Sequence, residues 1–195
     1  KNTQRLTPLY GALPLSTTLD TACAMTRSVR DAVLAHEVLA QRRVLRAQAP
    51  LSAYRLAVPT TAMLASLEPA VERAFALAIE RLRRAGARIE EIALPEIADL
   101  GSIQSAGGFA AAESYAWHQA LLASKGAGYD PRVRTRIERG ADTPAHAYVK
   151  LAWARQDWIA RVGRAAAGFD ALLSPTTPLV APTIASLAPA DGRDP

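Results

Sequence analysis

The middle of the chain changes from a strand-like to a helix-like pattern of hydrophobic residues and back again. Residues 54–58 form a short β-prone run that stops at Pro59, and residues 88–94 form a second run that stops at Pro95. The apolar residues between these runs recur at helical spacing, and they are Val71, Phe75, Ala78, Ile79 and Leu82. Strand, helix and strand with short connections predict a β-α-β unit, and hence a right-handed crossover in a parallel or mixed sheet.

The ends of this central helix carry recognisable start and stop residues. Ser66 can cap the N-terminus, Glu68 is favourable in the first turn, and Pro69 is tolerated there. Gly86 supplies a left-handed stop at the other end. We therefore expect the helix to begin just after Ser66 and to end at Gly86.

Helices are also predicted on both sides of the β-α-β unit. Thr26 or Ser28 can cap a helix in the residues that follow, and Ser28 with Asp31 has the spacing of a capping box. An alanine-rich segment over residues 100–124 predicts another helix, and Gly107–Gly108 suggests an irregular start or a close backbone approach.

The last third of the chain completes an α/β pattern. A turn over residues 126–131 leads to a short basic helix over residues 132–139, which Gly140 closes. A long helix is predicted from residue 143 to about residue 167, and residues 169–173 form a buried strand. The remaining tail, rich in proline, threonine and alanine, is predicted to be loop.

Composition indicates a globular protein. Of the 195 residues, 50% are hydrophobic, and no apolar run approaches the roughly 20 residues that a membrane-spanning helix needs. Residues 1–11 lack the apolar core of a signal peptide. The lone Cys23 excludes an internal disulfide framework and fits a reducing cytosol. We therefore expect a cytoplasmic protein with no membrane partner.

The net charge of +5 does not by itself indicate a nucleic-acid partner. Lysine occurs only at positions 1, 125 and 150, so arginine supplies nearly all of the positive charge. The arginines are spread over several predicted helices and often stand beside acids, as in Glu72–Arg73 and Glu80–Arg81. No zinc-finger, RRM or KH pattern accompanies them, so solvated helix faces are the favoured interpretation and we expect no nucleic acid.

The usual sources of catalytic chemistry are mostly absent. The three histidines, His36, His118 and His146, lie far apart and share no metal-ligand spacing with Cys, Asp or Glu. Cys23 has no evident base beside it and is interpreted as a small core residue. There is no Walker loop, dinucleotide fingerprint or GxSxG elbow. The sequence therefore predicts neither a metal site nor a cofactor.

Residues 1–32 read KNTQRLTPLYGALPLSTTLDTACAMTRSVRDA. This order resembles the amidase signature family, in which K-P-T precedes a G-x-x-P-L-S-x-x-L-D-T loop and a T/S-R-S/T-V-x-D helix start. Residues 129–140 and 170–178 agree with the family in order and spacing. The chain departs from the pattern at Asn2, where the family usually has Pro, and at Leu6, where Arg is common. The resemblance covers nearly the whole chain.

The resemblance implies a fold and a place within it. The fold is α/β, with three α/β/α layers and a mixed central sheet, and residues 1–195 form the C-terminal part of a single amidase signature domain. The family hydrolyses carboxamides with a Ser–cisSer–Lys triad, which lies upstream of this stretch. Lys1 aligns with a lysine downstream of the nucleophile, so we assign no catalytic residue here and expect this segment alone to be inactive.

The resemblance and the strand pattern together suggest substrate-lining residues. Ligands in open α/β sheets lie beyond the carboxyl ends of strands, which makes the loop after residue 173 a candidate, although a plain turn is an equal alternative. Arg136 aligns with an arginine that binds a substrate carboxylate in some family members. The alternative is that Arg136 is an ordinary arginine on the surface of a helix. Further candidates lie where members vary with substrate, and each could instead serve packing. The full set is Arg136, Ser174, Thr176, Thr177, Tyr115, Trp117 and His118.

The resemblance predicts an amidase that acts on a small-molecule amide. Family members that are the A subunit of a tRNA-dependent amidotransferase, which acts on misacylated tRNA, usually carry an S-R-Y-D-G-V-R-Y-G-like stretch, and residues 101–131 lack it. A protein of that kind remains an alternative, as does a non-catalytic binding fragment or paralogue. The expected partners are the amide substrate and the N-terminal remainder of the same polypeptide, and a homodimer is left open.

Overall fold

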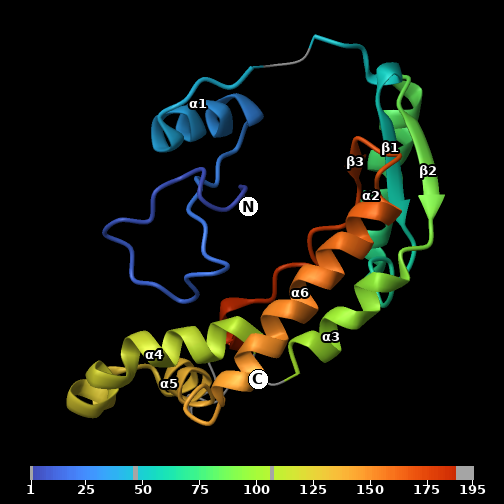
Figure 1. Cartoon of the computed structure of the whole chain (residues 1–195). Helices are drawn as coiled ribbons and strands as arrows, with labels where there is room; N and C mark the ends of the chain where they lie inside the picture. The colour runs from blue at the N-terminus through green and yellow to red at the C-terminus, as the bar shows by residue number, and fades with distance from the viewer. Residues whose placement is uncertain (1, 46–47, 106–107, 188–195) are drawn as a thin grey trace. The chain divides into compact units, whose positions relative to one another are not determined.

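The computed structural model describes residues 2–45, 48–105 and 108–187 (Figure 1). The chain divides into two compact units. One comprises residues 1–47 and 106–148, and the other comprises residues 48–105 and 149–195.

The second unit contains a three-stranded parallel sheet in the order β2-β1-β3 (Figure 1). Its strands are β1 (Arg55–Pro59), β2 (Arg88–Ile92) and β3 (Ala171–Leu172). The central strand β1 is the most buried, because both of its edges are paired. Its partners in register are Arg88 for Arg55 on one side and Ala171 for Leu56 on the other. The predicted β-α-β unit and the α/β class are confirmed.

The strand β3 is shorter than predicted, although its hydrogen bonds extend beyond it. The Asp170 N–H donates to the Arg55 carbonyl at 2.8 Å, and the Leu173 N–H donates to the Ala57 carbonyl at 2.8 Å. These two bonds flank the two paired residues, so the predicted run of residues 169–173 follows β1 but meets strand geometry only at its centre.

The helix α2 (Pro69–Arg84) connects β1 and β2, and its predicted N-cap was wrong. Glu68 is the cap residue and Pro69 occupies the first turn, while Ser66 lies outside the helix with φ at 56°. A left-handed Ser66 cannot hold the extended cap conformation. The predicted stop is confirmed: Gly86 has φ at 95°, and its N–H donates to the Arg83 carbonyl in a Schellman motif.

Strand β2 ends two residues earlier than predicted because the chain finds other hydrogen-bond partners. The Thr60 N–H donates to the Ile92 carbonyl at 2.9 Å, and the Leu94 N–H then donates to the Thr61 hydroxyl at 3.1 Å. Leu94 is fully buried at this turn. Pro95 then starts a short 3₁₀ helix, η2 (Pro95–Ala98).

The single helix expected over residues 100–124 was wrong, because the structure has two. They are α3 (Asp99–Ile103) in the second unit and α4 (Gly108–Lys125) in the first. The hydroxyls of Ser102 and Ser105 donate to carbonyls three residues back and so compete with regular helix hydrogen bonding at the end of α3. Gly107, part of the predicted irregular start, lies outside the described residues.

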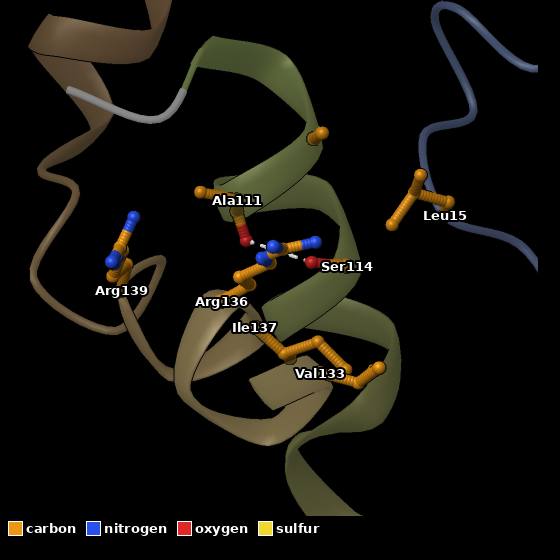
Figure 2. A pocket seen from close by; sticks show the side chains of 8 residues that line it. Leu15, Ala111, Ser114, Val133, Arg136, Ile137 and Arg139 are labelled. Atoms are coloured by element: carbon orange, nitrogen blue, oxygen red, sulfur yellow. Dashed lines mark hydrogen bonds between the residues drawn. The ribbon is translucent and has the colours of Figure 1, made fainter. Parts of the chain in front are cut away.

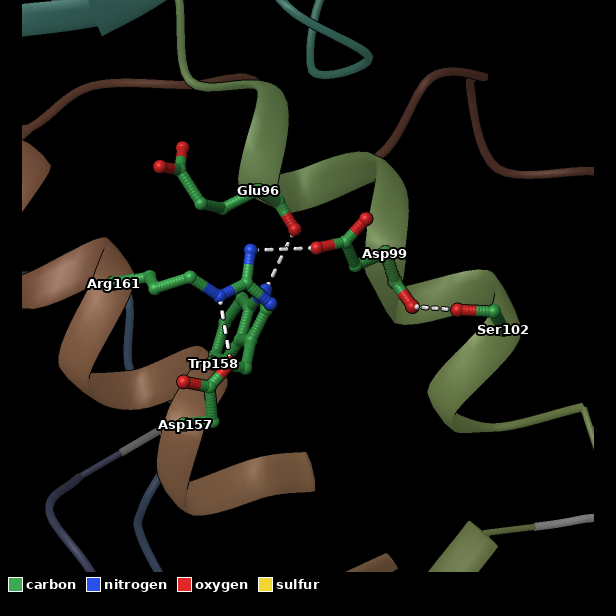
Figure 3. Close-up of polar contacts among 6 residues, drawn as sticks. All are labelled: Glu96, Asp99, Ser102, Asp157, Trp158 and Arg161. Atoms are coloured by element: carbon green, nitrogen blue, oxygen red, sulfur yellow. Dashed lines mark hydrogen bonds and ion pairs between the residues drawn. The ribbon is translucent and has the colours of Figure 1, made fainter. Parts of the chain in front are cut away.

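The long helix α6 (Ala145–Ala165) agrees with its prediction, and from Val149 onward it belongs to the second unit. Figure 3 shows the polar contacts between α6 and the segment that follows β2. The Trp158 Nε1–H donates to the Glu96 carbonyl at 2.7 Å. Arg161 bridges Asp99 at 2.7 Å and Asp157 at 2.8 Å. The indole hydrogen bond joins α6 to η2 and the Arg161–Asp99 ion pair joins α6 to α3, whereas the Arg161–Asp157 pair lies within α6.

The first unit consists of α1 (Val29–Ala40), α4, η3 (Gly126–Gly128), α5 (Pro131–Glu138) and the beginning of α6. The predicted cap of α1 is confirmed, since the Ser28 hydroxyl accepts from the Asp31 N–H at 3.1 Å. The short basic helix is confirmed as α5. The shorter 3₁₀ helices η1 (Leu51–Ala53) and η4 (Ile184–Leu187) lie in the other unit.

The helices α4 and α5 pack closely through small residues. Ala111 on α4 and Ile137 on α5 are 6% and 3% exposed. A Cβ atom added to Gly140 would lie 2.0 Å from the Ala111 carbonyl oxygen and 2.8 Å from the Tyr115 Cβ. Gly140 therefore allows a backbone approach that no other residue could make.

Within the described ranges, no helix combines the length and apolar character that crossing a bilayer requires.

Candidate functional site

A cavity of about 440 Å³ lies in the first unit between α4, α5 and the loop that precedes α1 (Figure 2). Its lining is mainly apolar on the α4 side and carries two arginines on the α5 side. The described lining residues are Leu15, Ala110, Ala111, Ser114, Val133, Arg136, Ile137 and Arg139. The predicted site residue Arg136 is therefore part of a real cavity.

The chemistry of this cavity suits a small, partly apolar anion. Arg136 lies in the last turn of α5 and Arg139 is the C-cap residue that follows the helix, so both arginines reach the cavity from the end of α5. Ser114 is only 2% exposed, and its hydroxyl donates to the Ala111 carbonyl at 3.2 Å. None of the described lining residues is acidic. Guanidinium groups beside apolar walls match a carboxylate on a short carbon chain.

Local sequence signals fix the start of α5 and hence the direction of its arginines. Asp130 caps the helix, its carboxylate accepting from the Arg132 N–H at 2.8 Å, and Pro131 occupies the first turn. Hydrogen bonds from the Arg132 side chain and then from its backbone lower the pKa of Asp130 to about 2. One turn on, Arg134 pairs with Glu138 at 2.7 Å along the helix. The charge on this cap is thus kept at all but strongly acidic pH.

The loop that carries Leu15 is closed by its own polar residues. One Asp20 carboxylate oxygen accepts from the N–H groups of Leu15 and Ser16, each at 2.9 Å. The Ser16 hydroxyl accepts from the Leu19 N–H at 3.2 Å. The P-L-S-x-x-L-D order noted in the sequence is therefore the set of residues that closes this turn.

Hydrogen bonds to Glu113 connect this loop with α4, on which Glu113 lies, and with the start of α6. Its carboxylate accepts from the Ser16 hydroxyl at 2.6 Å, the Thr18 N–H at 3.0 Å and the Thr18 hydroxyl. The Tyr148 hydroxyl at the start of α6 donates to the same carboxylate at 2.5 Å. Burial raises the pKa of Glu113, but the hydrogen bonds from these three residues outweigh it and lower the pKa overall. The hydrogen bond to Glu113 raises the pKa of Tyr148.

Three predicted site residues on α4 do not line this cavity. The Tyr115 Cβ lies against the close approach of α4 and α5 at Gly140. His118 Nδ1 and the Tyr129 hydroxyl share a hydrogen bond of 2.7 Å. The rings of Trp117 and His118 meet edge to face, with centroids 4.5 Å apart. Trp117, His118 and Tyr129 thus form an aromatic cluster.

The remaining predicted site residues belong to the second unit. Ser174, Thr176 and Thr177 lie in the loop that directly follows β3. The Thr177 hydroxyl donates to the Leu179 carbonyl at 2.9 Å. Just beyond the loop, Glu68 accepts from the Val180 N–H at 3.0 Å. The loop is therefore anchored to the start of α2, while Arg136 lies in the other unit.

Sequence reasoning missed Glu113, Ser114 and Arg139. A single acid within the apolar stretch AAAESYAW was a usable signal, since an acid there must find hydrogen-bond donors. In the part of the chain that the structure describes, no group of three or more His, Cys, Asp or Glu is placed to hold a metal ion. Cys23 is exposed and so does not occupy the predicted core position.

Comparison with known proteins identifies the family. Residues 1–194 match the Amidase family. The chain belongs to the amidase family. The resemblance seen in residues 1–32, 129–140 and 170–178 is thus confirmed.

Curated relatives of this amidase-family chain differ in their substrates. The chain is 32% identical over 183 residues to the 2-amino-5-chloromuconic acid deaminase of Comamonas testosteroni, covering 92% of this chain and 40% of that protein. It is 27% identical over 207 residues to the A component of the glutamyl-tRNA(Gln) amidotransferase of Roseiflexus sp. strain RS-1, covering 88% and 42%. The chain therefore spans about two fifths of the length of these relatives.

Solved structures agree with the family assignment. A crystal structure of an amidase superposes with a TM-score of 0.84 at 29% identity, covering 94% of this chain and 41% of that chain. The A component of the Thermotoga maritima glutamyl-tRNA(Gln) amidotransferase superposes with a TM-score of 0.68 at 25% identity, covering 97% and 44%. The amidase-family chain thus shares its fold with both kinds of protein.

Proposed function

We propose that the complete protein is an amidase that hydrolyses the carboxamide bond of a small molecule to a carboxylate and ammonia or an amine. The observation that carries this proposal is the family match over residues 1–194, together with the TM-score of 0.84 to an amidase. Because the chain spans only about 40% of its relatives, we place the Ser–cisSer–Lys triad in the remainder of the polypeptide.

The proposed reaction proceeds through an acyl-enzyme. An unprotonated Lys draws a proton through the bridging Ser and so activates the Ser nucleophile toward the amide carbonyl. Backbone N–H groups of a Gly/Ser loop stabilise the oxyanion, and ammonia or an amine leaves before water clears the acyl group. In this scheme the present chain supplies a substrate wall and part of the sheet, and alone it is inactive.

We further propose that the substrate carries a carboxylate, bound by Arg136 and Arg139. The support is the apolar cavity with two guanidinium groups and no described acid, together with the fact that a relative acts on 2-amino-5-chloromuconic acid. Ser174, Thr176 and Thr177, in the loop that follows β3 of the second unit, are kept as a separate proposal of substrate-lining residues.

The test uses the full-length protein and matched amides. A monoamide of a dicarboxylic acid should be hydrolysed, and the neutral diamide of the same length should be a poorer substrate. Arg136→Met or Arg139→Met should lower kcat/KM for the monoamide by about 10-fold or more, as expected for loss of a charged hydrogen bond. Arg134→Met, on the same helix but outside the cavity lining, is the control.

Each part of the proposal has its own contradicting result. Absence of hydrolysis of any aliphatic or aryl amide would refute the amidase. Hydrolysis that persists after the upstream Ser is replaced by Ala would refute the triad. An equal loss of kcat/KM in the Arg134→Met control would refute the carboxylate site and would leave the proposed amidase activity standing.

The A subunit of a tRNA-dependent amidotransferase is the alternative that the comparisons also support, through the curated relatives at 27% identity. A protein of that kind would act with its partner subunits on misacylated tRNA rather than on a free small amide. Assays with misacylated tRNA and with a panel of small amides separate the two functions. A non-catalytic binding protein would be inactive in both assays.

A further inference from the structure

The carboxylate of Glu113 joins three segments that are far apart in the chain. Ser16 and Thr18 precede it by 97 and 95 residues, and Tyr148 follows it by 35 residues. All four residues belong to the first unit. The connection is therefore a tertiary one, made by one side chain.

Both carboxylate oxygens are used. Oε2 accepts from the Ser16 hydroxyl and the Thr18 N–H, while Oε1 accepts from the hydroxyls of Thr18 and Tyr148. A carboxylate offers about four lone-pair positions, so these four donors saturate it. Ser16 is only 2% exposed, so without Glu113 its buried hydroxyl would lose its acceptor and could not replace it with water.

The side chain next to this connection forms one edge of the cavity. Leu15 directly precedes Ser16 and faces α4 and α5 from the loop (Figure 2). Leu15 is itself 57% exposed, so burial of its side chain contributes little to holding the loop. The Asp20 hydrogen bonds close the loop on itself but do not attach it to α4.

We propose that Glu113 is a positioning residue, whose hydrogen bonds hold the Leu15 edge of the cavity at a set distance from α4 and α5 and thereby select substrates by size. The inference rests on the proposed function, because the cavity must bind the amide substrate. Glu113 itself is not among the residues that line the cavity, so it acts through the loop.

Two substitutions separate positioning from charge. Glu113→Ala removes all four hydrogen bonds. Glu113→Gln can keep its amide oxygen toward the Thr18 N–H and the Ser16 hydroxyl. Its NH₂ group then faces the hydroxyls of Thr18 and Tyr148, which can turn to accept. The glutamine variant should therefore keep the geometry without the charge.

The experiment measures kcat and KM of the full-length enzyme for a short and a longer monoamide of a dicarboxylic acid. Glu113→Ala should raise KM for the preferred monoamide by about 10-fold with a smaller change in kcat, and should reduce the discrimination between the two lengths. Glu113→Gln should stay within about 3-fold of the wild type. Glu138→Ala, which removes an exposed acid of α5 outside the cavity lining, is the matched control.

Hydrogen exchange gives a readout that does not depend on activity. In Glu113→Ala the Thr18 amide should exchange at least about 10-fold faster, while the Ile137 amide in α5 should keep its protection. If Glu113→Ala fails to fold, Ser16→Ala removes one of the four hydrogen bonds to Glu113, together with the bond that its hydroxyl accepts from the Leu19 N–H, and should give smaller changes of the same kind. If the wild type hydrolyses no amide, the proposed function fails while the exchange result still tests the connection.

Either of two results would overturn the proposal. One is an unchanged exchange rate at Thr18 in Glu113→Ala. The other is an unchanged KM and length preference in that variant while the wild type is active. Equal kinetic damage in Glu113→Gln and Glu113→Ala would also refute positioning, because it would show that the charge is what matters.

Discussion

Replacing Gly140 by alanine should separate α4 from α5, and the size of the effect follows from three distances. The new Cβ would lie 2.0 Å from the Ala111 carbonyl oxygen, 2.5 Å from the Ala111 carbonyl carbon and 2.8 Å from the Tyr115 Cβ. The first two atoms are backbone atoms of α4, so no rotamer change relieves the contact. The helices must therefore move apart by about 1 Å or more to restore van der Waals contact.

This movement carries a cost that can be estimated. Overpacking a tight core contact costs about 1–3 kcal/mol, and separating the helices also exposes the buried surface of Ala111 and Ile137. We expect Gly140→Ala to lower the free energy of unfolding by about 3 kcal/mol. Because the m-value grows with protein size, that of the full-length protein should exceed the roughly 1–3 kcal/mol/M of small proteins, and the urea midpoint should fall by about 0.5 M.

The assay is urea unfolding of the full-length protein, with Gly163→Ala as the matched control. Gly163 lies inside α6, and a Cβ there would meet nothing within 4 Å. That control should raise the free energy of unfolding by about 0.5–1 kcal/mol, because alanine favours a helix interior over glycine. An unchanged urea midpoint for Gly140→Ala would refute the close approach of the two helices.

Two further predictions concern an ion pair and an indole hydrogen bond. Arg132 lowers the pKa of Asp130 to about 2, so the stability that the Asp130 charge contributes should be present above about pH 4 and lost as the pH falls toward 2. The difference in unfolding free energy between the wild type and Asp130→Asn, measured from pH 7 to pH 2, should therefore shrink below about pH 4. A difference that grows on acidification would contradict this prediction. Trp158→Phe removes the 2.7 Å hydrogen bond to the Glu96 carbonyl and should lower the free energy of unfolding by about 0.5–1.5 kcal/mol. Trp153→Phe, at a side chain that is 65% exposed, should lower it by less than about 0.5 kcal/mol. Equal urea midpoints for the two variants would contradict this prediction.

Features that depend on neighbouring residues were predictable. The Ser28 cap and the Gly86 stop each use backbone groups within five residues, and both are present as expected. The strand–helix–strand order followed from hydrophobic periodicity alone. Arg136, a predicted substrate-lining residue from the family resemblance, lines the cavity of the first unit, and its role stays a prediction.

Predictions failed where the chain had several local choices. Ser66 and Glu68 both stood at an acceptable distance from the first apolar residue, and Glu68 became the cap because Ser66 adopts a left-handed conformation. Residues 101–108 read GSIQSAGG, and the low helix propensity of its glycines was a signal. It predicted an irregular start of one helix, whereas α3 ends at Ile103 and α4 begins at Gly108.

The sequence by itself determined the family, the α/β class and the ends of several helices, because motifs and caps are read over short stretches of chain. Only the tertiary structure decided which side chains form the cavity. Glu113 becomes a connecting residue because Ser16, Thr18 and Tyr148 converge on it from distant positions. Gly140 becomes indispensable because the Ala111 backbone lies against it. Both roles arise from contacts between residues far apart in sequence, and local pattern contains no record of such contacts.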